Sequence, residues 1–309
     1  MRLHWQTHMT YSLDKLLVVG ISSRALFDLE AEEAIFQQQG LAAYRAHQLA
    51  NENAILMPGA GFALARSLLK LNQLQPDQRL VEVVIMSRNS SETSLRIFNS
   101  IQHYGLDITR AVLAGGAPLA PYLHAFNVSL FLSLHEDDVQ AAINAGTAAA
   151  LLYQKPANAL AELEQIRIAF DGDAVIFSDE SERIYQTQGI EAFEQHEREN
   201  ALKPLPEGPF ARLLKALSFI QNANANATPR PIRTALVTAR SSPSHERVIR
   251  TLRAWDVAID ETFFMGGVAK SDVLAAFKPH MFFDDQHGHC DRAAPLVQTG
   301  RVPLKAGTT

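Results

Sequence analysis

Short runs of apolar residues recur along the chain, and longer segments with helical spacing separate them. Segments such as Ser91–Tyr104 and Ser244–Ala254 repeat their apolar residues as an amphipathic helix does. The runs with the length of buried strands are Leu16–Ile21, Val81–Met86, Arg110–Leu113, Leu130–Leu134, Ile166–Phe170, Thr234–Val237, Glu261–Phe264 and Met281–Phe283. Nearly continuous apolar strands that alternate with helices predict an α/β fold with a parallel sheet covered on both faces.

Two segments interrupt this alternation. An Ala-rich pattern with helical character stops at Pro156, so Leu151–Ala159 is predicted to be a junction between two parts of the chain. Gln221–Pro231, with repeated Asn-Ala pairs and two prolines, is predicted to be a solvated loop. A chain of 309 residues is long enough for two domains. We expect them to be 1–155 and 156–309.

The two predicted parts resemble each other weakly. Val112–Gly116 matches Phe263–Gly267, which lies 151 residues later, and Phe131–Ser133 matches Phe282–Asp284 at the same distance. Matches in the same order and at a nearly constant distance indicate a duplicated α/β unit. In that alignment Leu119 stands opposite Lys270, and Ser133 stands opposite Asp284. The first part would then be a degenerate copy without chemistry of its own, although apolar strands also resemble one another by chance.

Composition narrows the class of protein. Apolar residues make up 47% of the chain and charged residues 20%, which is typical of a soluble globular protein. The formal net charge of −5 argues against a protein that binds nucleic acid polymers. The single cysteine, Cys290, allows no internal disulfide, and neither a signal peptide nor an apolar run of membrane-spanning length is found. We expect a cytoplasmic protein with no membrane partner.

Two acids, Asp171 and Asp173, flank Gly172 directly after the strand Ile166–Phe170. Carboxylates at the end of a buried strand are costly unless they are paired or bind a metal, and the carboxyl ends of parallel strands line the ligand crevice. One aspartate could attack phosphorus and form an aspartyl phosphate, and the other could move the proton of the leaving group. Taken alone, the stretch fits a plain Asp-Gly turn equally well.

Three further motifs follow apolar strands in the second part. Thr238 ends a strand and could donate to a phosphoryl oxygen, with Arg240 as a further anion contact. Lys270 opens a helix and could place a positive charge on phosphate. Asp284 and Asp285 follow the last apolar strand and suit Mg²⁺, which prefers carboxylate, water and phosphate oxygens. Each motif is commonplace in isolation, but together and in this order they favour a phosphoryl-transfer site.

The four motifs resemble those of the haloacid dehalogenase superfamily of phosphotransferring enzymes. Within it, the chain is similar to the type I cytosolic 5′-nucleotidases. This resemblance covers the chain from about Leu16 to Gln286. The stretches that carry it are Val19–Phe27, Ala169–Arg183, Leu236–Ser241 and Phe282–Gln286.

The resemblance implies a Rossmann-like catalytic domain and a set of residue roles. Asp171 resembles the nucleophile and Asp173 the general acid/base. Thr238 and Lys270 resemble the groups that hold the phosphoryl oxygens, and Lys270 also steadies the negative nucleophile. The residues before Thr238 leave room for a small inserted cap at about 179–230, which would close over the substrate and exclude water.

The resemblance also implies a metal and a substrate. Mg²⁺ would be held by the carboxylates of Asp171 and Asp284 and by the carbonyl of Asp173. Asp285 would be an auxiliary metal group. The implied reaction is Mg²⁺-dependent hydrolysis of nucleoside 5′-monophosphates such as AMP or IMP, and the resemblance further suggests a homo-oligomer. His287, His289 and Cys290 fit none of the strong zinc patterns and are set aside.

Three alternatives remain open at this point. The same chemistry would serve a phosphatase for another small phosphomonoester, for instance a sugar phosphate. It would also serve a phosphotransferase with a nucleoside acceptor in place of water. An alternative of another class is a non-catalytic module that binds nucleotides, against which the complete set of acids, hydroxyl and lysine argues.

Overall fold

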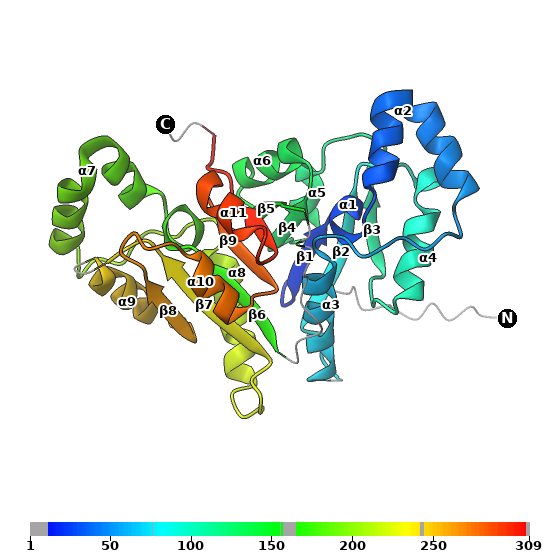
Figure 1. The fold of residues 1–309 in the computed structure, drawn as a ribbon. Coiled ribbons are helices and arrows are strands. Elements are labelled where there is room, and N and C mark those ends of the chain that lie inside the picture. The colour runs from blue at the N-terminus through cyan, green and yellow to red at the C-terminus, as the bar shows by residue number, and fades with distance from the viewer. Residues whose placement is uncertain (1–11, 76, 155, 157–164, 242–243, 307–309) are drawn as a thin grey trace.

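The computed structural model describes residues 12–75, 77–154, 156, 165–241 and 244–306. Its strands form one 10-stranded sheet in the order β3-β2-β1-β4-β5-β10-β9-β6-β7-β8. Every neighbouring pair is parallel except β5 and β10, which are antiparallel. Helices lie on both sides of this sheet in Figure 1. The predicted α/β fold with a mostly parallel sheet is confirmed.

The predicted strands are all present, with ends that differ by at most two residues. Their bounds are β1 Leu17–Ile21, β2 Val81–Ser87, β3 Arg110–Leu113, β4 Leu130–Ser133, β6 Ile166–Phe170, β7 Ile232–Thr238, β8 Glu261–Phe264 and β9 Met281–Asp284. The inner strands β1, β2 and β4 are buried along their whole length. Strands β3 and β8 are only partly buried, because they form the two edges of the sheet.

Two strands were not predicted, and both lie at the centre of the sheet. The helical interpretation of the Ala-rich segment before Pro156 is wrong, because Ala149–Leu152 forms strand β5. Thr299–Arg301 forms β10, which pairs with β5 and β9. Alanine favours helices in isolation, and Thr-Gly-Arg has no apolar pattern, so pairing with neighbouring strands decides both elements.

The two ends of the sheet repeat one pattern. The strand order β3-β2-β1-β4-β5 from one edge is matched by β8-β7-β6-β9-β10 from the other, each strand shifted by five in the numbering. This equal order is what a duplicated α/β unit predicts. The junction near Pro156 falls partly outside the described residues, so the division of the chain at 155 stays a proposal.

Each half carries one long bent helix in the same place. Helix α2 spans Glu30–Ala50 and helix α7 spans Glu180–Glu199, and they stand at the two upper corners of Figure 1. Both bend at a glycine with positive φ, 82° at Gly40 and 83° at Gly189, a region that other residues rarely enter. Thus the segment predicted to be a cap in the second half has a counterpart in the first.

The remaining helices cover the sheet. They are α1 Ser23–Leu26, α3 Phe62–Lys70, α4 Leu95–His103, α5 Ala120–Ala125, α6 Glu136–Asn144, α8 Ala211–Ala223, α9 His245–Ala254, α10 Ser271–Phe277 and α11 His287–Ala293, with single turns η1 Leu71–Gln73, η2 Ser91–Thr93 and η3 Gly172–Ile176. Helix α8 lies within the predicted cap range 179–230, yet its apolar face is buried. Helix α3 contacts β6, and α8 contacts β1, so the halves share one hydrophobic core.

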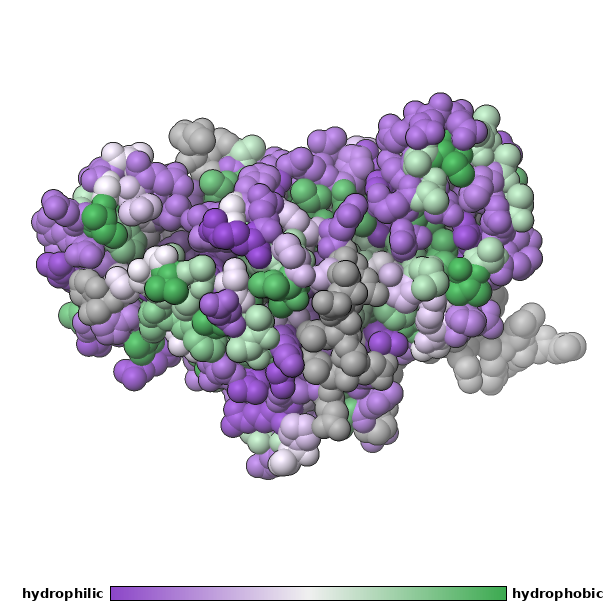
Figure 2. All heavy atoms as spheres, in the orientation of Figure 1, coloured by the Kyte–Doolittle hydropathy of each residue, from purple (hydrophilic) through white to green (hydrophobic). Residues whose placement is uncertain are grey.

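Among the described residues, no helix is long and apolar enough to cross a bilayer. Figure 2 shows a mostly hydrophilic face on which hydrophobic residues form small, separate patches.

His280 is a buried titratable residue, and its protonation makes the free energy of unfolding depend on pH. Its Nδ1 accepts a hydrogen bond from the backbone N–H of Arg167 at 3.1 Å, which requires an unprotonated nitrogen. Burial lowers the pKa of His280 to about 4. In the unfolded chain His280 becomes protonated below about pH 6.5, whereas in the folded chain it stays neutral down to about pH 4. The free energy of unfolding therefore falls as the pH drops from 6.5 to 4.

We predict that His280→Asn removes this part of the pH dependence, because an amide oxygen can accept the same hydrogen bond but does not titrate. Between pH 7.5 and pH 5 the wild type should lose up to about 2 kcal/mol more unfolding free energy than the variant. Urea denaturation at the two pH values measures this difference. Equal losses in both proteins would contradict the assignment.

Candidate active site

The candidate site lies at the carboxyl ends of inner strands in the second half of the sheet. Asp171 directly follows β6, Thr238 ends β7, and Asp284 ends β9. Strand β6 pairs in parallel with both β7 and β9, so these three carboxyl ends adjoin one another. Lys270 precedes α10 and enters the same space. The structure therefore brings together side chains that are far apart in the sequence.

Lys270 lies at the centre of this group. Its Nζ is 2.8 Å from Asp171 Oδ1 and 2.7 Å from Asp284 Oδ2, and all three side chains are buried. Burial alone would lower the pKa of Lys270, but the charges of the two carboxylates outweigh it and raise the pKa above its usual range. Lys270 is thus a permanent positive charge between two acids.

A third acid completes a carboxylate cluster. Oxygens of Asp171, Asp284 and Asp285 all lie within 4.8 Å of one another. Burial, partly offset by the charge of Lys270, raises the pKa of Asp171 to about 7. Burial and the charges of Asp171 and Asp284 raise the pKa of Asp285 to about 9. One lysine does not balance three carboxylates, so the donor set fits a hard divalent cation that prefers oxygen ligands.

Asp284 is the most firmly held of the three acids. Its carboxylate accepts from Lys270, from the backbone N–H of Gln286 at 2.9 Å, and contacts His289 Nδ1 at 3.1 Å. Although burial raises its pKa, the hydrogen bond with His289 and the charge of Lys270 lower it below the usual range. His289 was set aside in the sequence, but here it supports an acid of the cluster.

Asp173 lies apart from the carboxylate cluster and faces Arg240. The guanidinium donates to both carboxylate oxygens, from Nε at 2.8 Å and from NH2 at 2.6 Å. The same Arg240 also donates to Glu197 of α7 and lies over the ring of Phe193. Arg240 therefore links the predicted general acid/base to the bent helix.

Thr238 lies beside the loop that carries both aspartates. Its Oγ1 accepts a hydrogen bond from the backbone N–H of Arg240 at 3.3 Å. A Cβ atom at Gly172 would lie 3.2 Å from the same Oγ1. Glycine at this position therefore leaves the hydroxyl room to turn toward a ligand between the two aspartates.

This geometry can be compared with known proteins. The family model described as 5′-nucleotidase matches residues 9–309. The chain belongs to the 5′-nucleotidase family.

A curated relative supports this membership. The chain is 39% identical over 289 residues to a human protein named cytosolic 5′-nucleotidase 1B. The aligned region covers 91% of this chain and 47% of the human protein. The chain thus spans about half the length of this curated relative. No solved structure matches the chain. The resemblance predicted from the motifs is confirmed at the level of the family.

The site of this 5′-nucleotidase family member also contains groups that the sequence did not single out. Glu197 is fully buried and accepts from Ser181 at 2.8 Å and Arg247 at 2.9 Å, besides Arg240. Helix α7 contains several glutamates, and only tertiary structure distinguishes the buried one. Glu182, from the same helix, contacts Gln286 and adds to the negative charge around Asp285.

We predict that Glu197→Gln destabilises the protein by about 3 kcal/mol or more, because two buried guanidinium groups lose their shared counter-charge. The matched control is Glu194→Gln on the same helix. Glu194 pairs with the exposed Arg198, so its loss should cost less than about 1 kcal/mol. Thermal and urea denaturation of both variants measure the difference. Similar small changes in both would contradict a structural role for the Glu197 pairs.

Proposed function

We propose that this protein hydrolyses nucleoside 5′-monophosphates to nucleoside and phosphate. Membership of the 5′-nucleotidase family and similarity to a protein named cytosolic 5′-nucleotidase support this activity. The observation that carries the chemistry is the buried Lys270, which lies within hydrogen-bond distance of both Asp171 and Asp284. A site with fixed positive charge beside a carboxylate suits transfer of an anionic phosphoryl group.

We propose Mg²⁺ as the metal of this site. Asp171, Asp284 and Asp285 supply the carboxylate oxygens, and the carbonyl of Asp173 is the further ligand that the family resemblance implies. The raised pKa of Asp285 fits this assignment, since a divalent cation would let the buried acids ionise together. When bound, Mg²⁺ would offset the charge of the phosphate and of the acids around it.

In the proposed mechanism, Asp171 is the nucleophile. Its carboxylate attacks phosphorus, the bond from phosphorus to the 5′-oxygen breaks, and an aspartyl phosphate forms. Lys270 remains beside Asp171 and reduces its repulsion from the phosphate. The hydroxyl of Thr238 donates to a phosphoryl oxygen. Water then attacks the aspartyl phosphate, which releases phosphate and restores the carboxylate.

Asp173 is proposed to move the protons. It would give one to the 5′-oxygen as that bond breaks, and later take one from the attacking water. In the observed arrangement Arg240 engages both of its oxygens. Asp173 must therefore exchange partners during turnover, and the incoming phosphate offers Arg240 a new anion. Because Arg240 also binds Glu197, this exchange is coupled to the position of α7.

The nucleoside is proposed to bind beneath α7. Tyr185 and Phe193 of this helix form an edge-to-face pair with ring centroids 6.3 Å apart. Phe193 also faces Arg240, which places the pair next to Asp173. Aromatic rings provide a stacking surface that accepts different bases. We propose that the functional cap consists of α7 and its flanking loops, with α8 remaining packed in the core.

The cellular setting is proposed from the relative. The human protein is named cytosolic, and a cytoplasmic location of this chain is proposed on that basis. A homo-oligomer is also proposed, and sedimentation analysis of the purified chain tests it.

We predict that Asp171→Asn and Asp284→Asn both abolish hydrolysis but differ in stability. In the first variant Lys270 keeps Asp284 as its partner. In the second, Lys270 and His289 both lose a charged partner at a fully buried position. Metal-free thermal denaturation should show a lower Tm only for Asp284→Asn. Retained nucleotide hydrolysis by Asp171→Asn would contradict the role of Asp171 as the nucleophile.

We predict that the wild type releases phosphate from 5′-mononucleotides and that this release requires Mg²⁺. A panel of AMP, IMP, GMP, CMP, UMP and a sugar phosphate, ranked by kcat/KM with and without EDTA, measures it. Added nucleoside that captures the phosphate would show phosphotransfer. A preference for the sugar phosphate, or no release from any compound, would contradict the proposed substrate class.

A further inference from the structure

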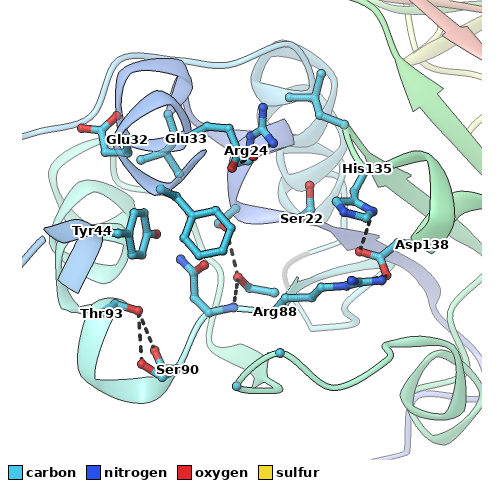
Figure 3. Close-up of a pocket in the computed structure, with 18 of the residues that line it drawn as sticks. Ser22, Arg24, Glu32, Glu33, Tyr44, Arg88, Ser90, Thr93, His135 and Asp138 are labelled. Atoms are coloured by element: carbon cyan, nitrogen blue, oxygen red, sulfur yellow. Dashed lines mark hydrogen bonds and ion pairs between the residues drawn. The ribbon is translucent and has the colours of Figure 1, made fainter. Parts of the chain in front are cut away.

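The first half of the chain contains a cavity of about 650 Å³. It lies where β1, β2 and β4 end and is bordered by α2. Figure 3 shows Ser22, Arg88 and Tyr44 around this space, with Arg24 and Glu33 on its α2 side. A volume of this size suits a small-molecule ligand. None of its lining residues belongs to the candidate active site.

The cavity occupies the place in the first half that the candidate active site occupies in the second. Two hydrogen bonds are repeated in equivalent positions. The backbone N–H of Asn89 donates to Ser87 Oγ at 3.1 Å, as that of Arg240 donates to Thr238. The backbone N–H of His135 donates to Ser133 Oγ at 3.1 Å, as that of Gln286 donates to Asp284. The strand pairing gives the same correspondence.

The groups that would serve phosphate and metal are absent at these equivalent positions. Ser22 stands where the second half has Asp171, and its hydroxyl accepts from the backbone N–H of Ala25. Ser133 stands in place of Asp284, and Leu119 in place of Lys270. Without these carboxylates and this lysine, the cavity has neither the nucleophile nor the metal ligands of the other half.

The arginines that line the cavity are already neutralised by carboxylates. Arg88 donates to Asp138 from two nitrogens, at 2.9 and 2.5 Å. Arg24 lies 3.1 Å from Glu33 and also pairs with Glu30. Arg45 pairs with Glu92. An anionic ligand would have to displace these acids, and no lysine like Lys270 among the described residues lines the cavity to offset its charge, so the electrostatics favour an uncharged ligand.

One feature of the second half is retained in the first. Phe36 and Tyr44 of α2 form an edge-to-face pair with ring centroids 6.0 Å apart. They correspond, 149 residues earlier, to Tyr185 and Phe193 of α7. Both pairs flank the glycine at which their helix bends. The aromatic surface proposed for the base is thus present twice, while the acids are present once.

Two polar residues beside the aromatic pair are neutral where the second half has charges. Gln48 stands in place of Glu197 and Asn89 in place of Arg240. Gln48 donates to the Tyr44 hydroxyl at 3.1 Å. The amide nitrogen of Asn89 lies near that hydroxyl but makes no hydrogen bond of ordinary geometry, and Arg24 Nε also lacks a partner among the described residues. These are donors suited to a neutral heterocycle.

We propose that the cavity of the first half binds an uncharged nucleoside, with its base against Phe36 and Tyr44. The choice of a nucleoside rests on the proposed function, of which a nucleoside is the product. The site would let the protein respond to its own product without competing for the catalytic acids.

Calorimetric titration of the full chain in EDTA tests this inference, with adenosine, inosine and AMP as probes. The wild type should bind at least one of the two nucleosides, and should bind it more tightly than AMP. Phe36→Ala changes a partly exposed side chain and should weaken nucleoside binding at least tenfold. Tyr44→Phe, which keeps the ring, should weaken it less. The control, Phe219→Ala on α8, changes an exposed aromatic side chain outside the cavity and should leave this binding within twofold of wild type.

Three results would overturn the inference: no nucleoside binding at millimolar concentration, binding that Phe36→Ala leaves intact, or tighter binding of AMP that depends on Phe36. Phosphate release from AMP with Mg²⁺ reports the proposed function separately. Release without binding in the first half overturns only this inference. Nucleoside binding there without any release overturns only the proposed function.

Discussion

The contact of Lys270 with Asp171 and Asp284 is the constraint on which the rest of the second half depends. Three carboxylates in a poorly hydrated volume repel one another, and burial penalises each charge. Lys270 offsets part of that cost, because it contacts acids at the carboxyl ends of β6 and β9, two strands that pair in the sheet. The remaining negative charge makes the site receptive to a cation. The excess of three carboxylates over one lysine therefore underlies the proposed metal binding and phosphoryl transfer.

A second buried network connects this site to the bent helix α7. Glu197 holds Arg240 and Arg247, and Arg240 in turn holds Asp173. Movement of α7 would therefore change the partners of the proposed proton-transfer group. The first half keeps the same strand order and a helix bent at the same point, but the neutral Gln48 and Asn89 stand in place of Glu197 and Arg240. One framework thus carries three clustered carboxylates in one half and, in the other, a cavity whose arginines are already paired with carboxylates.

Much of the fold could be predicted from the sequence because buried parallel strands are nearly continuous apolar runs. Strands β5 and β10 could not, since their short Ala-rich and Thr-Gly-Arg segments become strands only by pairing with neighbours. The acids, Thr238 and Lys270 were found because each occupies a strand end or helix start. Glu197, Arg247 and His289 were missed because their roles depend on contacts between distant elements, which no local pattern encodes.

The central claim is that Asp171 accepts the phosphoryl group. Rapid quenching in acid after mixing the protein with AMP labelled in its phosphate, in the presence of Mg²⁺, tests it most directly. The account predicts a transient labelled protein whose label maps to Asp171 and is absent from Asp171→Asn. Turnover of AMP with no labelled protein, together with turnover by Asp171→Asn, would contradict it.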